Sequence, residues 1–167
     1  MTSGPLPFDP VEEARQQWVR HGWAEAAEGM AAITSVMRAQ QILLARIDEA
    51  LRPLGLTFAR YEVLMLLLFS RAGALPMKTV GSRLQVHPTS VTNAVDRLEA
   101  AGLVRRRPHP DDGRAVLVAL TPEGRQRAEE ATAVLNAGVF ADPGIPARRV
   151  DALVGALRAL RQRAGDF

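Results

Sequence analysis

Arginines are concentrated in one short segment of the chain, and their spacing favours the binding of an anion. Arg105, Arg106 and Arg107 are consecutive, and Arg114 follows a segment rich in proline, aspartate and glycine that contains His109. Guanidinium groups bind phosphate and carboxylate oxygens through paired hydrogen bonds. The cluster is far more basic than the chain as a whole, whose formal net charge is +3. This pattern indicates a polyanionic partner, although a solvated run of charge is the simpler alternative.

A second set of side chains that could bind a partner lies earlier in the chain, directly after Pro88. Apolar residues recur there at helical spacing, which predicts one buried face on a helix over about 88–101: Val91, Ala94, Val95 and Leu98. Every other residue of the helix is polar or small, and its N-terminal half carries short hydroxyl and amide side chains. Near a helix N-terminus such groups can bond base edges, while the backbone N–H groups bind phosphate. Taken alone, such a polar face is more often simply solvated, but together with the basic segment it predicts entry into a major groove. We expect an arginine partner for Asp96, which lies on the polar face.

The elements that position these residues follow from the sequence pattern. Strand-length segments at Leu103–Arg107 and Ala115–Leu120 predict a hairpin, which forms a wing over about 103–120. Met77–Leu84 predicts a short helix, joined by a turn at residues 85–87 to the helix after Pro88. Before them, Phe58–Arg71 predicts a helix that is buried from Val63 to Phe69. The expected module is therefore a winged helix-turn-helix.

Amphipathic helices are predicted on both sides of this module. Asp9 and Pro10 predict an N-cap and first turn, and residues 1–9 are interpreted as a disordered tail. Helical periodicity recurs over Ala24–Arg52, over Pro122 to about Phe140 and over Ala147–Arg163. Such faces exceed what one small domain needs, so they predict contacts between two copies of the chain. The expected division is a tail at 1–9, dimerisation helices at 10–55 and 122–167, and the DNA-binding region at 56–121.

Composition limits the alternatives. The chain is 47% hydrophobic and 23% charged, which is typical of a globular protein, and the predicted fold class is mainly α with a small β-hairpin wing (α+β). It contains no cysteine, so disulfides and thiol chemistry are excluded. The histidines, His21, His87 and His109, lack metal-ligand spacing, and we predict neither a metal nor a cofactor.

Membrane and enzymatic functions are also disfavoured. The longest apolar run is far shorter than the roughly 20 residues of a membrane span, and no secretory leader is visible, so we expect a cytoplasmic protein. Neither a glycine-rich phosphate loop nor a nucleophile motif is present, so we do not expect an enzyme. An open alternative is a winged-helix adaptor whose basic wing binds an acidic protein, and it predicts no sequence-specific affinity for DNA.

From Leu56 to Arg125 the sequence resembles the multiple antibiotic resistance regulator (MarR) family of winged helix-turn-helix transcription regulators. The residues that carry the resemblance are LTFARYEVLMLL and LPMKTVGSRLQVHPTSVTNAVDRLEAAGLVRRRPHPDDGRAVLVALTPEGR. The resemblance implies a homodimer in which the first and last helices of both chains interlock. It also implies a repressor that binds a pseudo-palindromic site on double-stranded DNA.

The resemblance implies specific DNA contacts. It places them on Asp112 and Arg114 of the wing, where the acid orients the arginine that enters the minor groove, and on Thr89, Ser90, Thr92, Asn93 and Arg97. Arg105, Arg106, Arg107 and His109 complete the predicted DNA-binding set. A turn-forming role before Gly113 is the alternative for Asp112.

Many relatives in this family are released from DNA by small phenolic or other aromatic compounds, so the resemblance also implies a possible effector site. The helices that could line such a pocket carry Met37, Gln41, Phe58, Tyr61 and Met65. Core packing is the alternative for each of these side chains.

Overall fold

The computed structural model describes residues 4, 6–84, 88–110, 112 and 114–167. The predicted turn at 85–87 and several residues of the predicted tail and wing tip (1–3, 5, 111 and 113) lie outside the described residues. The chain divides into two compact units, Met1–Glu49 and Ala50–Phe167. It is mostly helical with a small antiparallel sheet, which confirms the predicted fold class. Within the described residues, no helix is long and apolar enough to cross a membrane.

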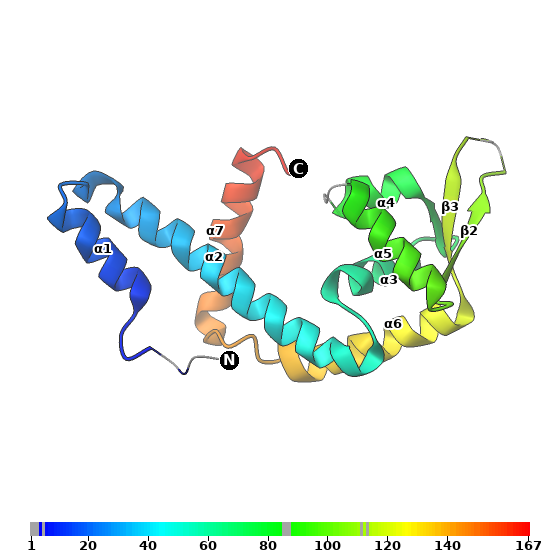
Figure 1. Ribbon diagram of the computed structural model, residues 1–167, viewed down its shortest axis with the longest axis horizontal. Helices are drawn as coiled ribbons and strands as arrows, with labels where there is room; N and C mark the ends of the chain where they lie inside the picture. Colours follow the sequence, from blue (N-terminus) through cyan, green and yellow to red (C-terminus); the bar gives the residue numbers. More distant parts are fainter. Residues whose placement is uncertain (1–3, 5, 85–87, 111, 113) are drawn as a thin grey trace. The chain divides into compact units, whose positions relative to one another are not determined.

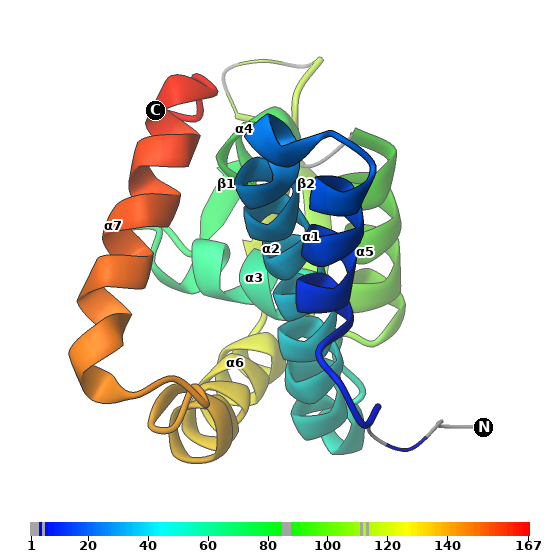
Figure 2. The same cartoon turned by 90° about the vertical axis from the view of Figure 1, so that its left-hand side faces the viewer.

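The first unit contains α1 (Pro10–Arg20) and most of α2 (Ala24–Leu51). The side chain of Asp9 accepts a hydrogen bond from the backbone N–H of Val11 at 2.9 Å, which confirms the predicted N-cap. Helix α1 folds back beside the first part of α2 (Figures 1 and 2). Arg15 of α1 bridges to Glu28 of α2 at 3.0 Å, and Trp18 packs edge-on against Trp23. Trp23 lies in the turn just before α2, so the tryptophan contact stabilises this turn, while the Arg15–Glu28 ion pair joins the two helices.

The second unit begins with a short 3₁₀ turn, η1 (Arg52–Leu54), and with α3 (Phe58–Leu68). The predicted end of α3 at Arg71 is wrong, because the chain leaves the helix at Leu68 and turns through Ser70, whose hydroxyl donates to the Leu67 carbonyl at 2.7 Å. The expected burial through Phe69 is also wrong, since that side chain is 78% exposed. The buried part of α3 is formed by Tyr61, Val63, Leu64 and Leu67.

The wing belongs to a sheet of three strands. Strands β2 (Val104–Pro108) and β3 (Val116–Leu120) form the expected antiparallel hairpin, with Arg106 opposite Val118. Strand β1 (Ala74–Pro76) pairs with the other edge of β3, and it was not predicted from the sequence. With three residues it is too short to show a strand periodicity. Pairing on both edges fixes β3 firmly within the module.

The remaining helices follow the predicted order. They are α4 (Met77–Leu84), α5 (Pro88–Ala100), α6 (Pro122–Leu135), its π-helical continuation η2 (Asn136–Phe140), and α7 (Ala147–Arg163). The core of the winged module lies between α3, α4, α5, the sheet and α6. Fully buried aliphatic side chains fill it, among them Leu64, Leu67, Val80, Val95, Leu98 and Val118.

Helix α6 is fastened to the base of the wing. The Thr121 hydroxyl caps α6 by accepting the backbone N–H of Gly124 at 2.9 Å, and it lies 2.8 Å from the carbonyl oxygen of Gly102, to which it donates. At Gly124 the backbones approach so closely that an added Cβ would lie 1.9 Å from the carbonyl oxygen of Leu103. Only glycine fits this contact, which fixes the start of α6 against the strand that carries the arginines.

Candidate nucleic-acid interface

Helix α5 is held by its apolar face and presents its polar face outward. Val91, Val95 and Leu98 are at most 3% exposed, as predicted, because they pack into the module core. The expected burial of Ala94 with them is wrong, since this residue is only half-buried. The predicted reading residues are all exposed: Thr89, Ser90, Thr92, Asn93 and Arg97. A rigid helix that displays short polar groups at its N-terminal half has the geometry required for contacts with base edges.

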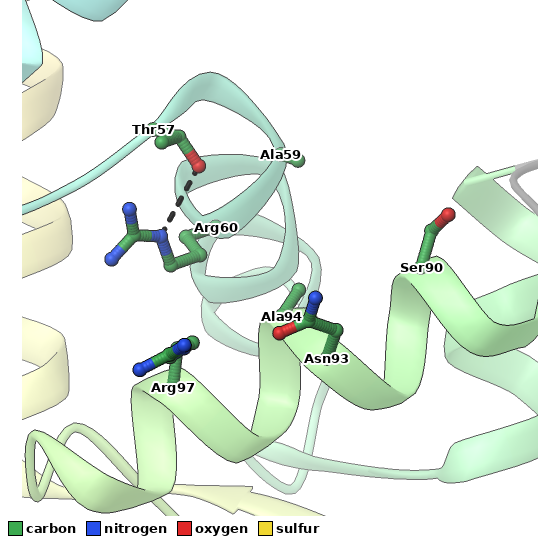
Figure 3. A pocket seen from close by; sticks show the side chains of 7 residues that line it. All are labelled: Thr57, Ala59, Arg60, Ser90, Asn93, Ala94 and Arg97. Carbon is green, nitrogen blue, oxygen red and sulfur yellow. Dashed lines mark hydrogen bonds between the residues drawn. The ribbon is translucent and has the colours of Figure 1, made fainter.

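A groove of about 590 Å³ runs beside this polar face. It lies between α5 and the start of α3, and its lining is Thr57, Ala59, Arg60, Ser90, Asn93, Ala94 and Arg97 (Figure 3). Figure 3 shows Ser90, Asn93 and Arg97 along α5, across from the first turn of α3. The groove therefore combines uncharged hydrogen-bonding groups with two guanidinium groups, a combination suited to an anionic polymer.

Arg60 is the site residue that sequence reasoning missed. Its Nε–H donates to the Thr57 hydroxyl at 3.2 Å, and its terminal nitrogen donates to the Gly55 carbonyl at 2.9 Å. These two bonds hold the side chain at the groove wall. Sequence spacing gave no signal for it, because Arg60 and Arg97 lie far apart in the chain and are brought together by the packing of α3 on α5.

Arg106 connects the wing to α5. Its backbone N–H donates to Glu99 at 2.7 Å, and its guanidinium bonds both Glu99 and Asp96. The expected arginine partner of Asp96 is thereby confirmed as Arg106. The backbone and side-chain hydrogen bonds from Arg106 lower the pKa of Glu99 below its ordinary value. Asp96 and Glu99 thus share one cation.

The other predicted wing residues lie in different environments. Arg105 and Arg107 are exposed and alternate with Arg106 along β2, so they lie on the opposite face of the hairpin. Arg114 is exposed in the turn just before β3, and His109 is half-buried, with its backbone N–H donating to the Ala115 carbonyl at 3.0 Å. The cluster that looks uniform in the sequence is therefore divided between two faces.

Asp112 stabilises the turn through the backbone. Its side chain accepts a hydrogen bond from the backbone N–H of Arg114 at 3.0 Å. The contact described for this carboxylate is the turn-forming one that was its alternative role, and its orientation of the Arg114 guanidinium stays a prediction. A short Asp side chain bonds the backbone two residues ahead more readily than it reaches a guanidinium at the same spacing.

Comparison with known proteins gives consistent matches. The MarR family model matches residues 54–115. A crystal structure of Sco5413, a MarR family transcriptional regulator from Streptomyces coelicolor, shares 53% sequence identity with a TM-score of 0.77, and the match covers 84% of this chain and 97% of that one. This chain belongs to the MarR family.

Two further relatives show the range of similarity. A mutant of MarR from E. coli, complexed with operator DNA, is 26% identical with a TM-score of 0.72, over 81% of this chain and 96% of that one. The HTH-type transcriptional repressor Mb2911 of Mycobacterium bovis is 32% identical over 60% of this chain and 70% of its own length. Other curated relatives are covered over 44% to 62% of their lengths. Solved MarR-family proteins also include complexes with DNA and with p-coumaroyl-CoA.

The residues predicted to line an effector pocket belong to two helices of this MarR-family chain. Met37 and Gln41 are exposed on α2. On α3, the Tyr61 hydroxyl lies 3.1 Å from the Thr132 hydroxyl of α6, which also lies 3.3 Å from the Met65 sulfur, and Phe58 stacks on Tyr61. The α3 side chains therefore make the core contacts that were their alternative role, while the effector site stays a prediction.

Proposed function

We propose that this chain is a cytoplasmic, homodimeric transcription regulator that binds a pseudo-palindromic operator on double-stranded DNA and acts as a repressor. The observation that carries the proposal is the exposed polar face of α5, backed by buried Val91, Val95 and Leu98 and flanked by the groove with Arg60 and Arg97. This face offers hydrogen-bonding groups for bases and cations for phosphates on one rigid surface.

The proposal assigns different roles to the helix and the wing. Asn93, Ser90 and Thr92 read base edges in the major groove, where an amide can make paired bonds with adenine. Arg60 and Arg97 contact the phosphates beside the helix, and Arg107 and Arg114 provide the wing's positive charge. Arg106 positions the hairpin, because both acids of α5 already occupy its guanidinium.

Exposed apolar side chains support the homodimer. Ile33 on α2 is 68% exposed, and Val154 and Leu160 on α7 are each 58% exposed. Large apolar side chains at helical spacing are typical of a surface that a second copy covers. In such a dimer the two α5 helices would enter successive major grooves about 34 to 36 Å apart, which is the spacing of a pseudo-palindromic site.

Fluorescence anisotropy tests the proposal. The full chain is titrated into labelled promoter DNA from beside its own gene and into a scrambled duplex, across a series of salt concentrations. We expect a Kd of about 10⁻⁸ M or tighter for the promoter alone, with a steep loss on added salt. Equal and weak binding to both duplexes would overturn sequence-specific recognition and favour the adaptor alternative.

Single substitutions test the assignment of roles. Asn93→Ala should relax the preference at particular base pairs, with a loss of about 1 to 3 kcal/mol on the promoter and little on the scrambled duplex. Arg114→Ala should weaken binding to both duplexes and reduce the salt dependence. Arg148→Ala, exposed on α7 and opposite the apolar face of that helix, is the matched control and should change neither. An Asn93→Ala loss of equal size on both duplexes would remove its reading role.

We also propose that a small aromatic compound releases the protein from its operator. Small phenolic acids added to the preformed protein–promoter complex test this, with anisotropy as the readout. Release that saturates with concentration would support an effector site, and release that tracks ionic strength alone would contradict it.

A further inference from the structure

A second hollow, of about 640 Å³, lies at the base of the wing. Three arginines line it, and each comes from a different element: Arg71 from the turn after α3, Arg105 from β2 and Arg125 from α6. The other lining residues are Ser70, Ala72, Gly73, Leu120, Thr121, Pro122, Gln126 and Glu129. Its size falls within the roughly 300 to 1,000 Å³ of small-molecule sites.

These three arginines differ from Arg106 in their partners. Within the part of the chain that the structure describes, no side-chain hydrogen bond or ion pair is found for Arg71, Arg105 or Arg125, whereas Arg106 bonds two carboxylates. Glu129 is the acid in the lining, so the three guanidiniums outnumber it. Three like charges around one hollow repel one another, and a bound anion relieves that repulsion.

The hollow is separate from the proposed DNA-reading surface. It shares no lining residue with the groove beside α5. Arg106 bonds to α5, and because successive residues of a strand point to opposite faces, its neighbour Arg105 lies on the other face of the hairpin. The unpaired arginines therefore surround a space that α5 does not border.

We propose that this hollow binds a small, multiply charged anion that carries phosphoryl or several carboxylate groups. Guanidinium is the side chain best matched to such groups, because it offers paired N–H donors to two oxygens of one phosphate or carboxylate. Three guanidiniums from three elements can neutralise two or more negative charges at once. A singly charged or uncharged ligand would leave part of the repulsion in place.

The position of the hollow gives the bound anion a structural effect. It connects the turn that precedes β1, the strand β2 and the first turns of α6, so a ligand there links the base of the wing to the helix behind it. Binding raises the stability of the folded chain by mass action. An effect of the anion on operator affinity rests on the proposed function, whereas anion binding itself does not.

Calorimetry and thermal unfolding of the full chain without DNA test the proposal. The probes are pyrophosphate and citrate, and chloride at matched ionic strength is the control. We expect saturable binding of at least one probe with a Kd below about 1 mM and a rise in Tm that chloride does not reproduce. Arg125→Gln and Arg71→Gln should each weaken that binding by roughly tenfold, the scale of one lost charge-assisted contact. Arg148→Gln, on exposed α7, should leave it unchanged.

Three outcomes would overturn the proposal. The first is an absence of saturable binding beyond the chloride control, and the second is binding that the Arg125→Gln and Arg71→Gln variants retain in full. The third would show that the arginines serve flanking DNA phosphates: either variant would lower operator affinity and reduce the salt slope by about one unit while free anions fail to bind. Because the anion titrations contain no DNA, a failure of operator binding leaves their result intact.

Discussion

The winged module and helix α7 differ in how far their apolar side chains are buried. In the module, most apolar side chains of α3, α5 and β3 are buried or half-buried, and residues such as Leu64, Val95 and Val118 are inaccessible to solvent. Helix α7 has no buried residue, and Val154 and Leu160 are each more than half exposed. Since burial of apolar surface is the main source of stability, the module is complete as a folded unit while α7 lacks a covering partner.

The polar surfaces differ in the same sense. The module exposes polar and charged side chains on α5 and around the base of the wing, whereas α7 exposes apolar side chains. The module is therefore suited to bind an anion, and α7 is suited to pack against an apolar surface. Separate mutations can disrupt each of these properties.

Disrupting the packing of the winged module should have the largest effect on the free energy of unfolding. Gly124→Ala places a Cβ 1.9 Å from the carbonyl oxygen of Leu103, so α6 must move away from the wing. We expect a loss of about 3 kcal/mol in the free energy of unfolding, at the upper end of the cost of overpacking. Urea unfolding followed by circular dichroism measures it.

Gly81→Ala in α4 is the matched control. Its added Cβ would lie 3.7 Å from the Val91 side chain, which is an ordinary contact. Alanine in a helix interior is favoured over glycine by roughly 0.5 to 1 kcal/mol, so this variant should be unchanged or more stable. Similar losses of unfolding free energy for both variants would show that the close approach of Gly124 to Leu103 does not determine the stability of the module.

Placing a charge on the uncovered face of α7 should have the next largest effect. Val154 is 58% exposed, and Val154→Glu should weaken dimerisation by about 2 kcal/mol or more, because a carboxylate would be buried between two copies. Sedimentation velocity at several protein concentrations measures the dissociation, and circular dichroism should show an unchanged helix content. A monomer whose winged module stays folded would show that the exposed face of α7 serves dimerisation and the buried core serves folding.

Val116→Glu is the matched valine control on the wing. Val116 is 42% exposed on β3, outside the face assigned to dimerisation, so this variant should sediment as the wild type does. A wild-type dimer for Val154→Glu, or equal dissociation of the two variants, would remove α7 from the proposed interface.

Helix boundaries were largely predictable from the sequence, because they depend on local signals. Asp9 with Pro10, Thr121 with Pro122, and the apolar spacing of α5 each fix an element through contacts within a few residues. The early end of α3 and the exposure of Phe69 were not predictable, since an apolar run gives no sign that the chain will turn into a short strand. Strand β1 exists through its pairing with β3, which is a tertiary contact.

The candidate site was predictable in its residue types and not in its partners. The exposed face of α5 followed from helical periodicity, and Asp96 was expected to pair with an arginine. Which arginine of the run at 105–107 turns toward α5 depends on the register of β2 against β3, which the sequence does not reveal. The same register directs Arg105 toward the second hollow, which is bordered by residues from three distant segments.

The smallest expected effect distinguishes two neighbouring arginines of the wing. Arg106→Ala removes the ion pairs with Asp96 and Glu99, and since these side chains are partly exposed we expect a stability loss of about 1 kcal/mol or less. Operator affinity should fall with an unchanged salt slope, because the wing is misplaced while no phosphate contact is lost. Arg107→Ala should do the reverse, with unchanged stability and a salt slope reduced by about one unit.

The pH dependence of stability separates the ion pair from a packing effect. The pKa of Glu99 is lowered in the folded chain, so its contribution is present above the ordinary value of 4.5 and is lost as the pH falls through the lowered pKa. The difference in unfolding free energy between wild type and Arg106→Ala should therefore shrink with acidification across this range. Glu99→Gln keeps the side-chain shape and should lack that acid-dependent part. A pH-independent difference would mean that Arg106 stabilises the wing through its aliphatic stem, and a reduced salt slope for Arg106→Ala would return this arginine to the DNA contacts.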